Sequence, residues 1–167
     1  MNRQPQRQRI IIYTDGACKG NPGPGGYGIL MLLENSTYKK QFSGGFRRTT
    51  NNRMELTAII EALKRIRKPN QDVLVVTDSK YVSDAIEKGW LQKWILRDFK
   101  KVKNPDLWRQ LADLLQKHHV EFMWVKGHDK HPQNNYVDRL AVKAASQPPH
   151  RLAVDEVYER MNPLTDD

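Results

Sequence analysis

Cysteine is almost absent from this chain, since Cys18 is the only one among 167 residues. An intrachain disulfide is therefore excluded, and so is a metal site built on several cysteines. A protein without disulfides suits a reducing compartment, so we expect a cytoplasmic location. Cys18 itself is interpreted as a small residue in a loop.

Long apolar runs are also missing. No stretch approaches the roughly 18 apolar residues that a membrane-spanning helix needs. The first nine residues are polar and basic, and we expect no signal peptide there because they lack its apolar segment. Neither a lipidation signal nor a basic amphipathic helix is found. We therefore expect no membrane partner, and a chain of this length suits one main domain.

Negative charge is scarce relative to positive charge. Lysine and arginine number 28 against 19 aspartates and glutamates, which gives a net charge of +9 and a pI near 9.7. The balance is uneven, because residues 152–167 hold five acids and one arginine. That end carries −4, which leaves +13 on the rest of the chain. So basic a body favours a polyanionic partner such as nucleic acid.

Hydrophobic patterning predicts an α/β domain. Apolar runs bounded by turn residues indicate strands at 10–14, 27–34, 37–42, 72–77 and 120–125. Helical spacing indicates helices at 52–67, 79–88, 106–118 and 134–146. A short polar turn makes the second and third strands a hairpin, which Gly44-Gly45 should end. Helix-borne connections favour parallel pairing of the later strands. We expect one mixed five-stranded sheet flanked by helices.

The expected domain plan has three parts: a basic arm at 1–9, the domain at 10–147, and an acidic tail at 148–167. Composition leaves the tail either disordered or with one short helix. Because the motifs described below end before the tail, we expect the domain to fold and act without residues 152–167.

Four carboxylates stand at positions where they could meet. Asp15 and Asp78 each follow an apolar run, and parallel neighbouring strands would bring both to one edge of the sheet. Glu55 and Asp138 each lie near the start of a predicted helix, on its inward face. Each also has a structural explanation. Asp15-Gly16 suits a turn, and Asp78-Ser79 suits a helix cap. Glu55 could complete a capping box with Asn52, and Asp138 could favour its helix dipole.

Four converging acids would repel one another unless cations neutralised them. Ligand sets made of oxygen alone suit Mg²⁺ or Mn²⁺ rather than zinc. Two such ions about 3.5–4 Å apart are the arrangement used for in-line phosphoryl transfer. The acids therefore point to metal-dependent phosphate chemistry.

Five motifs carry a resemblance to a known family. They are YTDG at 13–16, GNPGPGGYG at 20–28, TTNNRMEL at 49–56, TDSKYV at 77–82, and VKGH at 125–128 with Asn134 and Asp138 following. In order and spacing they resemble bacterial type 1 ribonuclease H, from about residue 10 to 146. The resemblance implies a ribonuclease H-like fold, with strands one to three antiparallel and strands four and five parallel.

The implied activity is hydrolysis of the RNA strand of RNA/DNA hybrids by a monomeric endonuclease. It uses two Mg²⁺ ions, for which Mn²⁺ could substitute, and leaves 5′-phosphate and 3′-hydroxyl ends. The metal ligands map onto Asp15, Glu55, Asp78 and Asp138, and an assisting loop histidine maps onto His128. Alternatives for His128 are a zinc pair with His131 or a solvated loop residue, and a single cysteine disfavours zinc.

Substrate contacts are implied for polar residues beside the acids. Asn21, Thr50, Asn51 and Asn52 could reach a minor groove and hydrogen-bond a 2′-hydroxyl, although turn and cap chemistry also uses these residue types. Lys80 stands where the family usually has glutamine, and it would add attraction for phosphate.

The segment 88–103 holds six cations and one acid with aromatic residues interleaved. It looks like a shortened form of the family's basic protrusion, in which cations hold phosphates and aromatic rings pack on sugars or bases. Candidate contacts are Trp90, Lys93, Trp94, Lys100 and Lys101. The alternative is a charged helix whose tryptophans form a local core, which we expect for one of the two.

Two other functions compete with this interpretation. A non-catalytic module could bind hybrids or duplexes, but binding alone does not require four acids. Another nuclease could share the fold, but the asparagines and the basic segment favour hybrid recognition.

Overall fold

The computed structural model describes residues 8–127 and 131–165. The elements in chain order are β1 (Ile10–Cys18), β2 (Gly23–Leu33), β3 (Lys39–Thr49), α1 (Asn51–Lys64), β4 (Asp72–Thr77), α2 (Lys80–Glu87), α3 (Trp90–Leu96), α4 (Pro105–Leu115), β5 (His119–Trp124), α5 (Pro132–Ala145), the 3₁₀ turn η1 (Pro149–Arg151) and α6 (Glu156–Met161). None of the helices described is long and apolar enough to cross a membrane.

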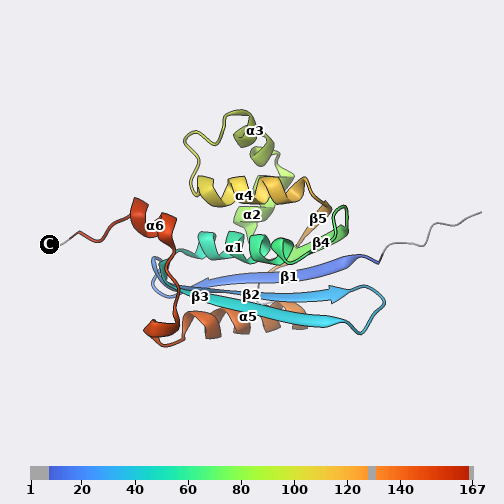
Figure 1. Cartoon of the computed structure of the whole chain (residues 1–167), viewed down its shortest axis with the longest axis horizontal. Helices are drawn as coiled ribbons and strands as arrows, with labels where there is room; N and C mark the ends of the chain where they lie inside the picture. The colour runs from blue at the N-terminus through green and yellow to red at the C-terminus, as the bar shows by residue number, and fades with distance from the viewer. Residues whose placement is uncertain (1–7, 128–130, 166–167) are drawn as a thin grey trace, which may run out of the picture.

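The sheet is mixed, with strand order β3-β2-β1-β4-β5. β1, β2 and β3 are antiparallel, whereas β4 runs parallel to both β1 and β5. Helix α1 covers one face with α2, α3 and α4 outside it, and α5 covers the other (Figure 1). The predicted five-stranded mixed sheet is confirmed. Parallel pairing follows from burial, because β4 is covered on both faces and Val73 to Val76 are all buried.

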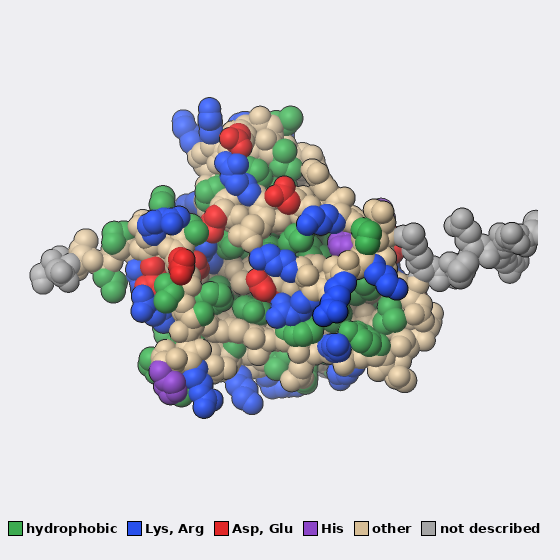
Figure 2. Space-filling model, viewed as in Figure 1, with side chains coloured by type: hydrophobic (Ala, Val, Ile, Leu, Met, Phe, Trp, Pro, Cys, Tyr) green, Lys and Arg blue, Asp and Glu red, His purple; other side chains and the backbone are tan. Residues whose placement is uncertain are grey.

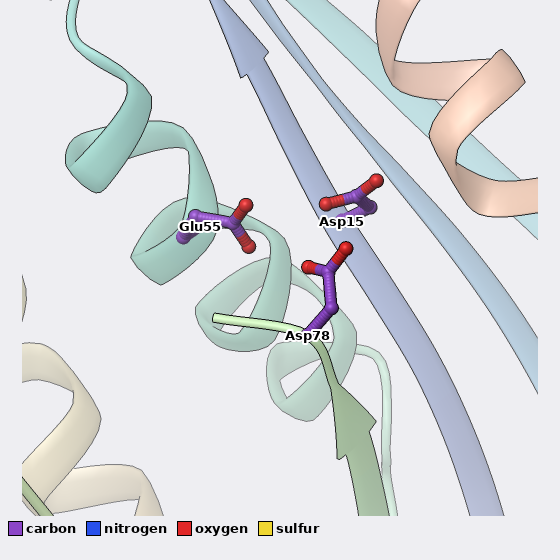
Figure 3. A group of neighbouring side chains, drawn as sticks. All are labelled: Asp15, Glu55 and Asp78. Carbon is purple, nitrogen blue, oxygen red and sulfur yellow. The ribbon is translucent and has the colours of Figure 1, made fainter. Parts of the chain in front are cut away.

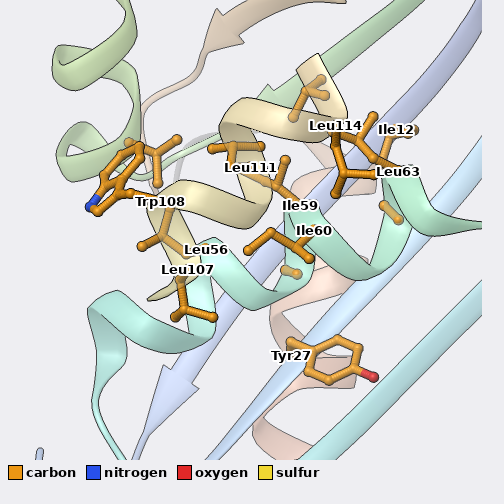
Figure 4. Packing of buried hydrophobic residues seen from close by; sticks show 14 of the residues in the cluster. Ile12, Tyr27, Leu56, Ile59, Ile60, Leu63, Leu107, Trp108, Leu111 and Leu114 are labelled. Atoms are coloured by element: carbon orange, nitrogen blue, oxygen red, sulfur yellow. The ribbon is translucent and has the colours of Figure 1, made fainter. Parts of the chain in front are cut away.

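Helix α1 lies between the sheet and α4 and is therefore buried on two sides. Ten of its 14 residues are buried, more than the single apolar face that helical spacing predicted. The packing joins Leu56, Ile59, Ile60 and Leu63 of α1 to Ile12 of β1 and to Leu107, Trp108, Leu111 and Leu114 of α4 (Figure 4). This rigid sandwich holds the start of α1 in place.

Two boundaries of α1 differ from the prediction. The helix begins at Asn51 after Thr50, whose side chain accepts from the backbone N–H of Arg53. Thr50 has the extended backbone of a cap residue, so the predicted capping box between Asn52 and Glu55 is wrong and Glu55 is not used as a cap. The helix ends at Lys64, three residues before the predicted end.

Strand β3 runs past Gly44-Gly45, where we expected it to end. Gly44 pairs with Tyr27, and Gly45 pairs with Gly26. Added Cβ atoms at Gly28 and Gly45 would lie 2.4 Å and 2.3 Å from carbonyl oxygens of α5. Glycine is therefore required here because the α5 backbone lies directly on the sheet.

The basic segment contains the short helix α3. Trp94 packs edge-on against the buried Trp108, with ring centroids 5.1 Å apart, whereas 39% of Trp90 is exposed. One tryptophan of the pair therefore belongs to a local core, which is what we expected.

The tail contains η1 and α6 within its described residues. Ala153 forms a parallel bridge with Phe46 at the β3 edge, and Arg47 of β3 pairs with Glu159 of α6 at 2.9 Å. This segment therefore lies against the domain (Figure 1).

Candidate active site

Three carboxylates from three separate elements meet at one edge of the sheet. Asp15 belongs to β1, Glu55 to the first half of α1, and Asp78 follows β4 directly. Each offers an oxygen atom, and the three atoms lie within 4.8 Å of one another (Figure 3). The parallel register pairs Thr14 with Thr77, so Asp15 and Asp78 follow at the same level.

Gly16 allows Glu55 to approach Asp15. A Cβ atom at Gly16 would lie only 2.5 Å from the backbone nitrogen of Glu55, so any larger residue would push α1 away from β1. The Gly16 N–H also donates to Oδ1 of Asp15 at 2.9 Å, which orients that carboxylate. The turn interpretation of Asp15-Gly16 is wrong, because β1 continues through both residues to Cys18.

Burial makes these acids costly to ionise. Only 3% of Asp15 and 5% of Glu55 is exposed, and Oε2 of Glu55 is buried without a hydrogen-bond partner. Burial raises the pKa of Asp15 well above its ordinary value, and the charges of Glu55 and Asp78 raise it further. Burial and the charge of Asp78 likewise raise the pKa of Glu55. An orphaned carboxylate oxygen beside two other acids fits a hard cation well.

Asp138 lies on the wall of the same small cavity. The cavity measures about 150 Å³ and is lined by Asp15, Gly16, Glu55, Asp78, Asn134, Asn135 and Asp138. Asp138 stands outside the compact group of three found among the described residues. The structure thus brings three predicted acids together and places the fourth beside them, from the opposite face of the sheet.

Sequence reasoning missed several neighbours of the acids. Asn134, only 2% exposed, and Asn135 line the cavity, and both precede Asp138 by one helical turn on α5. Asn134 stood in the fifth motif but was given no role, and Asn135 was not singled out. That spacing is the signal that could have identified them. Trp124 was missed too. Its indole N–H donates to the backbone oxygen of Asp78 at 3.1 Å, across the β4–β5 edge.

Four of the polar residues predicted to contact substrate lie in the β1–β2 loop or at the start of α1. The side-chain oxygen of Asn21 accepts from the backbone N–H of Asn51 at 3.0 Å, which joins the β1–β2 loop to the start of α1. Thr50 is the helix cap, and Asn52 is exposed. Lys80 is exposed as well, with its Nζ 5.2 Å from the ring centre of Trp124.

Lys93, Lys100 and Lys101 are all exposed on the part of the molecule that α3 forms, where blue side chains are seen at the top of Figure 2. None of these three lysines is among the residues that line the acid cavity.

His128 lies outside the described residues.

The mixed five-stranded sheet with its acidic cluster defines the class of protein, which is that of the ribonuclease H-like fold. Comparison with known proteins gives the family. The RNase H family model matches residues 7–146, so the chain belongs to the ribonuclease H family and is a hydrolase. Its bacterial relatives place it with type 1 enzymes, ribonucleases HI.

One such relative is Ribonuclease H of Rippkaea orientalis, 50% identical over 164 residues, which covers 95% of this chain and 96% of the relative. Ribonuclease HI of Synechocystis sp. is 45% identical over 154 residues, which covers 89% of this chain and 94% of the relative. Among solved structures, LC9-RNase H1, a type 1 RNase H with the type 2 active-site motif, matches with a TM-score of 0.77 at 31% identity. That match covers 98% of this chain and 84% of the other.

Proposed function

We propose that this protein is an endonuclease that hydrolyses the RNA strand of RNA/DNA hybrids and leaves 5′-phosphate and 3′-hydroxyl ends. The observation that carries the proposal is the cluster of Asp15, Glu55 and Asp78, with a buried carboxylate oxygen that has no partner. Relatives about half identical to the chain over nearly its full length are named ribonuclease H. The basic surface supplies the attraction for a polyanion that such a substrate needs.

Asp15, Glu55 and Asp78 would hold divalent ions, with Asp138 as a further ligand. A ligand set made only of oxygen atoms favours Mg²⁺, and Mn²⁺ could substitute for it. Two ions would be bound when substrate is present. Bound there, the ions would supply a water of lowered pKa and neutralise charge at the scissile phosphate.

The chain's own residues have three tasks. Burial and Gly16 hold the Asp15 and Glu55 carboxylates close together in a polar cavity of about 150 Å³. Asn21, Thr50, Asn51 and Asn52 would bind the minor groove and distinguish a 2′-hydroxyl from deoxyribose. An imidazole nitrogen of His128 would move a proton and help the product leave, a role that rests on the VKGH motif alone.

The α3 region would hold phosphates away from the cut. Lys93, Lys100 and Lys101 are exposed there, and the exposed Trp90 could pack on a sugar or base. Trp94 was also a candidate contact, but its packing on Trp108 gives it a supporting role. Lys80, stacked near Trp124, would attract a phosphate close to Asp78.

The enzyme would act as a monomer. It would work in the cytoplasm, because a chain with one cysteine suits a reducing compartment.

The test is a cleavage assay with labelled RNA/DNA hybrid, RNA duplex and DNA duplex, each with and without Mg²⁺. We expect cleavage of the hybrid's RNA strand, and only when Mg²⁺ is present.

Asp78→Asn should lower turnover by at least about 100-fold while hybrid binding persists, because a metal ligand is lost but the phosphate contacts remain. Asp72→Asn, at the other end of β4, is the matched control and should retain activity.

Two outcomes would contradict the proposal. Hybrid binding without cleavage under any divalent ion would indicate a binding module. Equal cleavage of all three duplexes would indicate a different nuclease that shares the fold.

A further inference from the structure

A buried arginine stands next to the acidic cluster in sequence. Arg53 is two residues before Glu55 in the first turn of α1, and only 4% of it is exposed. Its guanidinium donates to Asp106 of α4 at 2.9 and 2.7 Å, and to Asp155 at 2.7 and 2.9 Å. Burial alone would lower the pKa of Arg53, but both carboxylates outweigh it and raise the pKa, so the group stays charged.

Asp155 reaches this arginine from the C-terminal segment, outside the residues that the family model matches. Its side chain is about nine-tenths buried. Besides Arg53, it accepts a hydrogen bond of 2.7 Å from Oγ1 of Thr49, the last residue of β3. One carboxylate therefore joins the end of β3 to the first turn of α1. Glu55 follows Arg53 by two residues on the same helix.

Polar contacts, rather than apolar packing, hold the segment on α1. Helix α6 has no buried residue, and a cavity of about 290 Å³ separates α1, α4 and the segment around residues 154–157. Other polar contacts of the segment, such as the ion pair of Arg47 and Glu159, reach β3 and not α1. Asp155 is thus the described residue through which the segment acts on the acid-bearing helix.

We propose that Asp155 is a positioning residue for Glu55, which connects the C-terminal segment to the active site. The inference rests on the function proposed above. Loss of the carboxylate would leave Arg53 with Asp106 and Asn104 and release the hydroxyl of Thr49 and the backbone N–H of Tyr158. The start of α1 could then shift. Because α1 touches Gly16 so closely, a small shift changes how Glu55 faces Asp15 and Asp78.

The consequence is weaker binding of divalent ions. Residues that orient metal ligands typically change metal affinity by about 10–100-fold when they are mutated. Substrate contacts by the exposed lysines of the α3 region would change less, because Asp155 touches none of them. The proposal replaces our expectation that the domain acts without residues 152–167.

The experiment compares Asp155→Ala and Asp155→Asn with wild type at a temperature where circular dichroism shows every variant fully folded. For Asp155→Ala we expect about tenfold more Mg²⁺ for half-maximal activity, with a smaller change in the KM for hybrid. Calorimetric titration with Mn²⁺ alone should show the same loss of affinity. Asp155→Asn keeps the shape and an acceptor oxygen, so it should recover part of the loss.

Two controls separate positioning from general stability. Glu159→Gln removes the ion pair of the same segment and should leave metal affinity unchanged. Leu115→Ala weakens the core at the end of α4 and should lower the melting temperature without changing metal affinity. Wild-type Mn²⁺ affinity in Asp155→Ala would overturn the inference, even if that variant melts earlier. Failure of the wild type to cleave hybrid would instead overturn the proposed function, and the titration still tests Asp155.

Discussion

Asp15 shows how the burial of a single acid can lower the stability of the fold at neutral pH. Its carboxylate is buried beside Glu55 and Asp78, and the pKa of Asp15 is raised, first by burial and then by these charges. The folded state therefore holds a proton that the unfolded state releases near pH 4. Stability contributed by the protonated acid is complete below that pH and is lost as pH rises toward the raised pKa.

Asp15→Asn should accordingly stabilise the protein in the presence of EDTA at pH 8. We expect a gain of at least about 1 kcal/mol, or about 2–4 °C in Tm, because the wild-type acid must take up a proton from solution to be buried at pH 8, whereas asparagine is neutral in both states. The gain should disappear near pH 4, where the wild-type acid is protonated in both states. Thermal melts at both pH values test this, and a lower Tm for the variant at pH 8 would contradict it.

His128 is placed by its motif alone, so its role needs a direct test. His128→Ala should slow turnover by about 10²–10⁴-fold, the usual contribution of a general acid or base, and leave hybrid binding intact. Single-turnover and steady-state rates on the same hybrid would show whether chemistry or product release is slowed. Unchanged kinetics would remove His128 from the mechanism.

At the scale of elements, α5 carries Asp138 to the acids by lying directly on the sheet. A Cβ atom at Gly28 would meet the carbonyl oxygen of Val137 at 2.4 Å, so the helix approaches β2 as closely as its backbone allows. Asp138 follows Val137 directly. Its position beside Asp15 therefore depends on the absence of a side chain on a neighbouring strand.

Gly28→Ala should push α5 outward and lower stability by about 1–3 kcal/mol, the usual cost of overpacking. Turnover should fall as well, because Asp138 moves with the helix. Urea unfolding and kcat measure the two effects. Ser43→Ala, on the residue of β3 paired with Gly28, is exposed and should stay within about 0.5 kcal/mol of wild type. A fully stable and active Gly28→Ala variant would show that α5 adjusts freely.

For the α3 region, we expect the double variant Lys100→Ala and Lys101→Ala to raise KM for hybrid several-fold with little change in kcat. Both residues are exposed and would contact phosphates away from the cut, so they contribute binding equally in the ground and transition states. The double variant Lys117→Ala and Lys143→Ala is the charge-matched control, because it removes two exposed cations outside the α3 region, and it should change KM less. Equal effects of the two changes would mean that only net charge matters.

At the scale of the whole molecule, charge is divided between a basic body and a small acidic cavity. Hybrid binding by the Asp78→Asn variant should therefore weaken steeply between 50 and 200 mM salt, by about 10³-fold if six phosphates are contacted. Fluorescence anisotropy at several salt concentrations tests this. Affinity that is insensitive to salt would mean that the net charge of +9 has little part in recognition.

Much of this architecture could be predicted because its signals are local. The apolar runs before Asp15 and Asp78 indicated buried parallel strands ending at one edge, and the sheet has that pairing. The path of β3 through Gly44-Gly45 could not be predicted in this way. Two adjacent glycines normally end a strand, and only the tertiary structure shows why they are needed: a Cβ atom would meet the ring of Tyr27 at Gly44 and a carbonyl oxygen of α5 at Gly45.

The sequence by itself determined the class of fold, the family and the four acids, because periodic burial and motif spacing are written along the chain. Only the tertiary structure decided how closely those acids approach and what orients them. The contact between Arg53 and Asp155 spans 102 positions, and no local pattern marks it. Burial is the physical reason, since the same carboxylate is an ordinary surface acid in an extended chain and a strong constraint once the fold removes water around it.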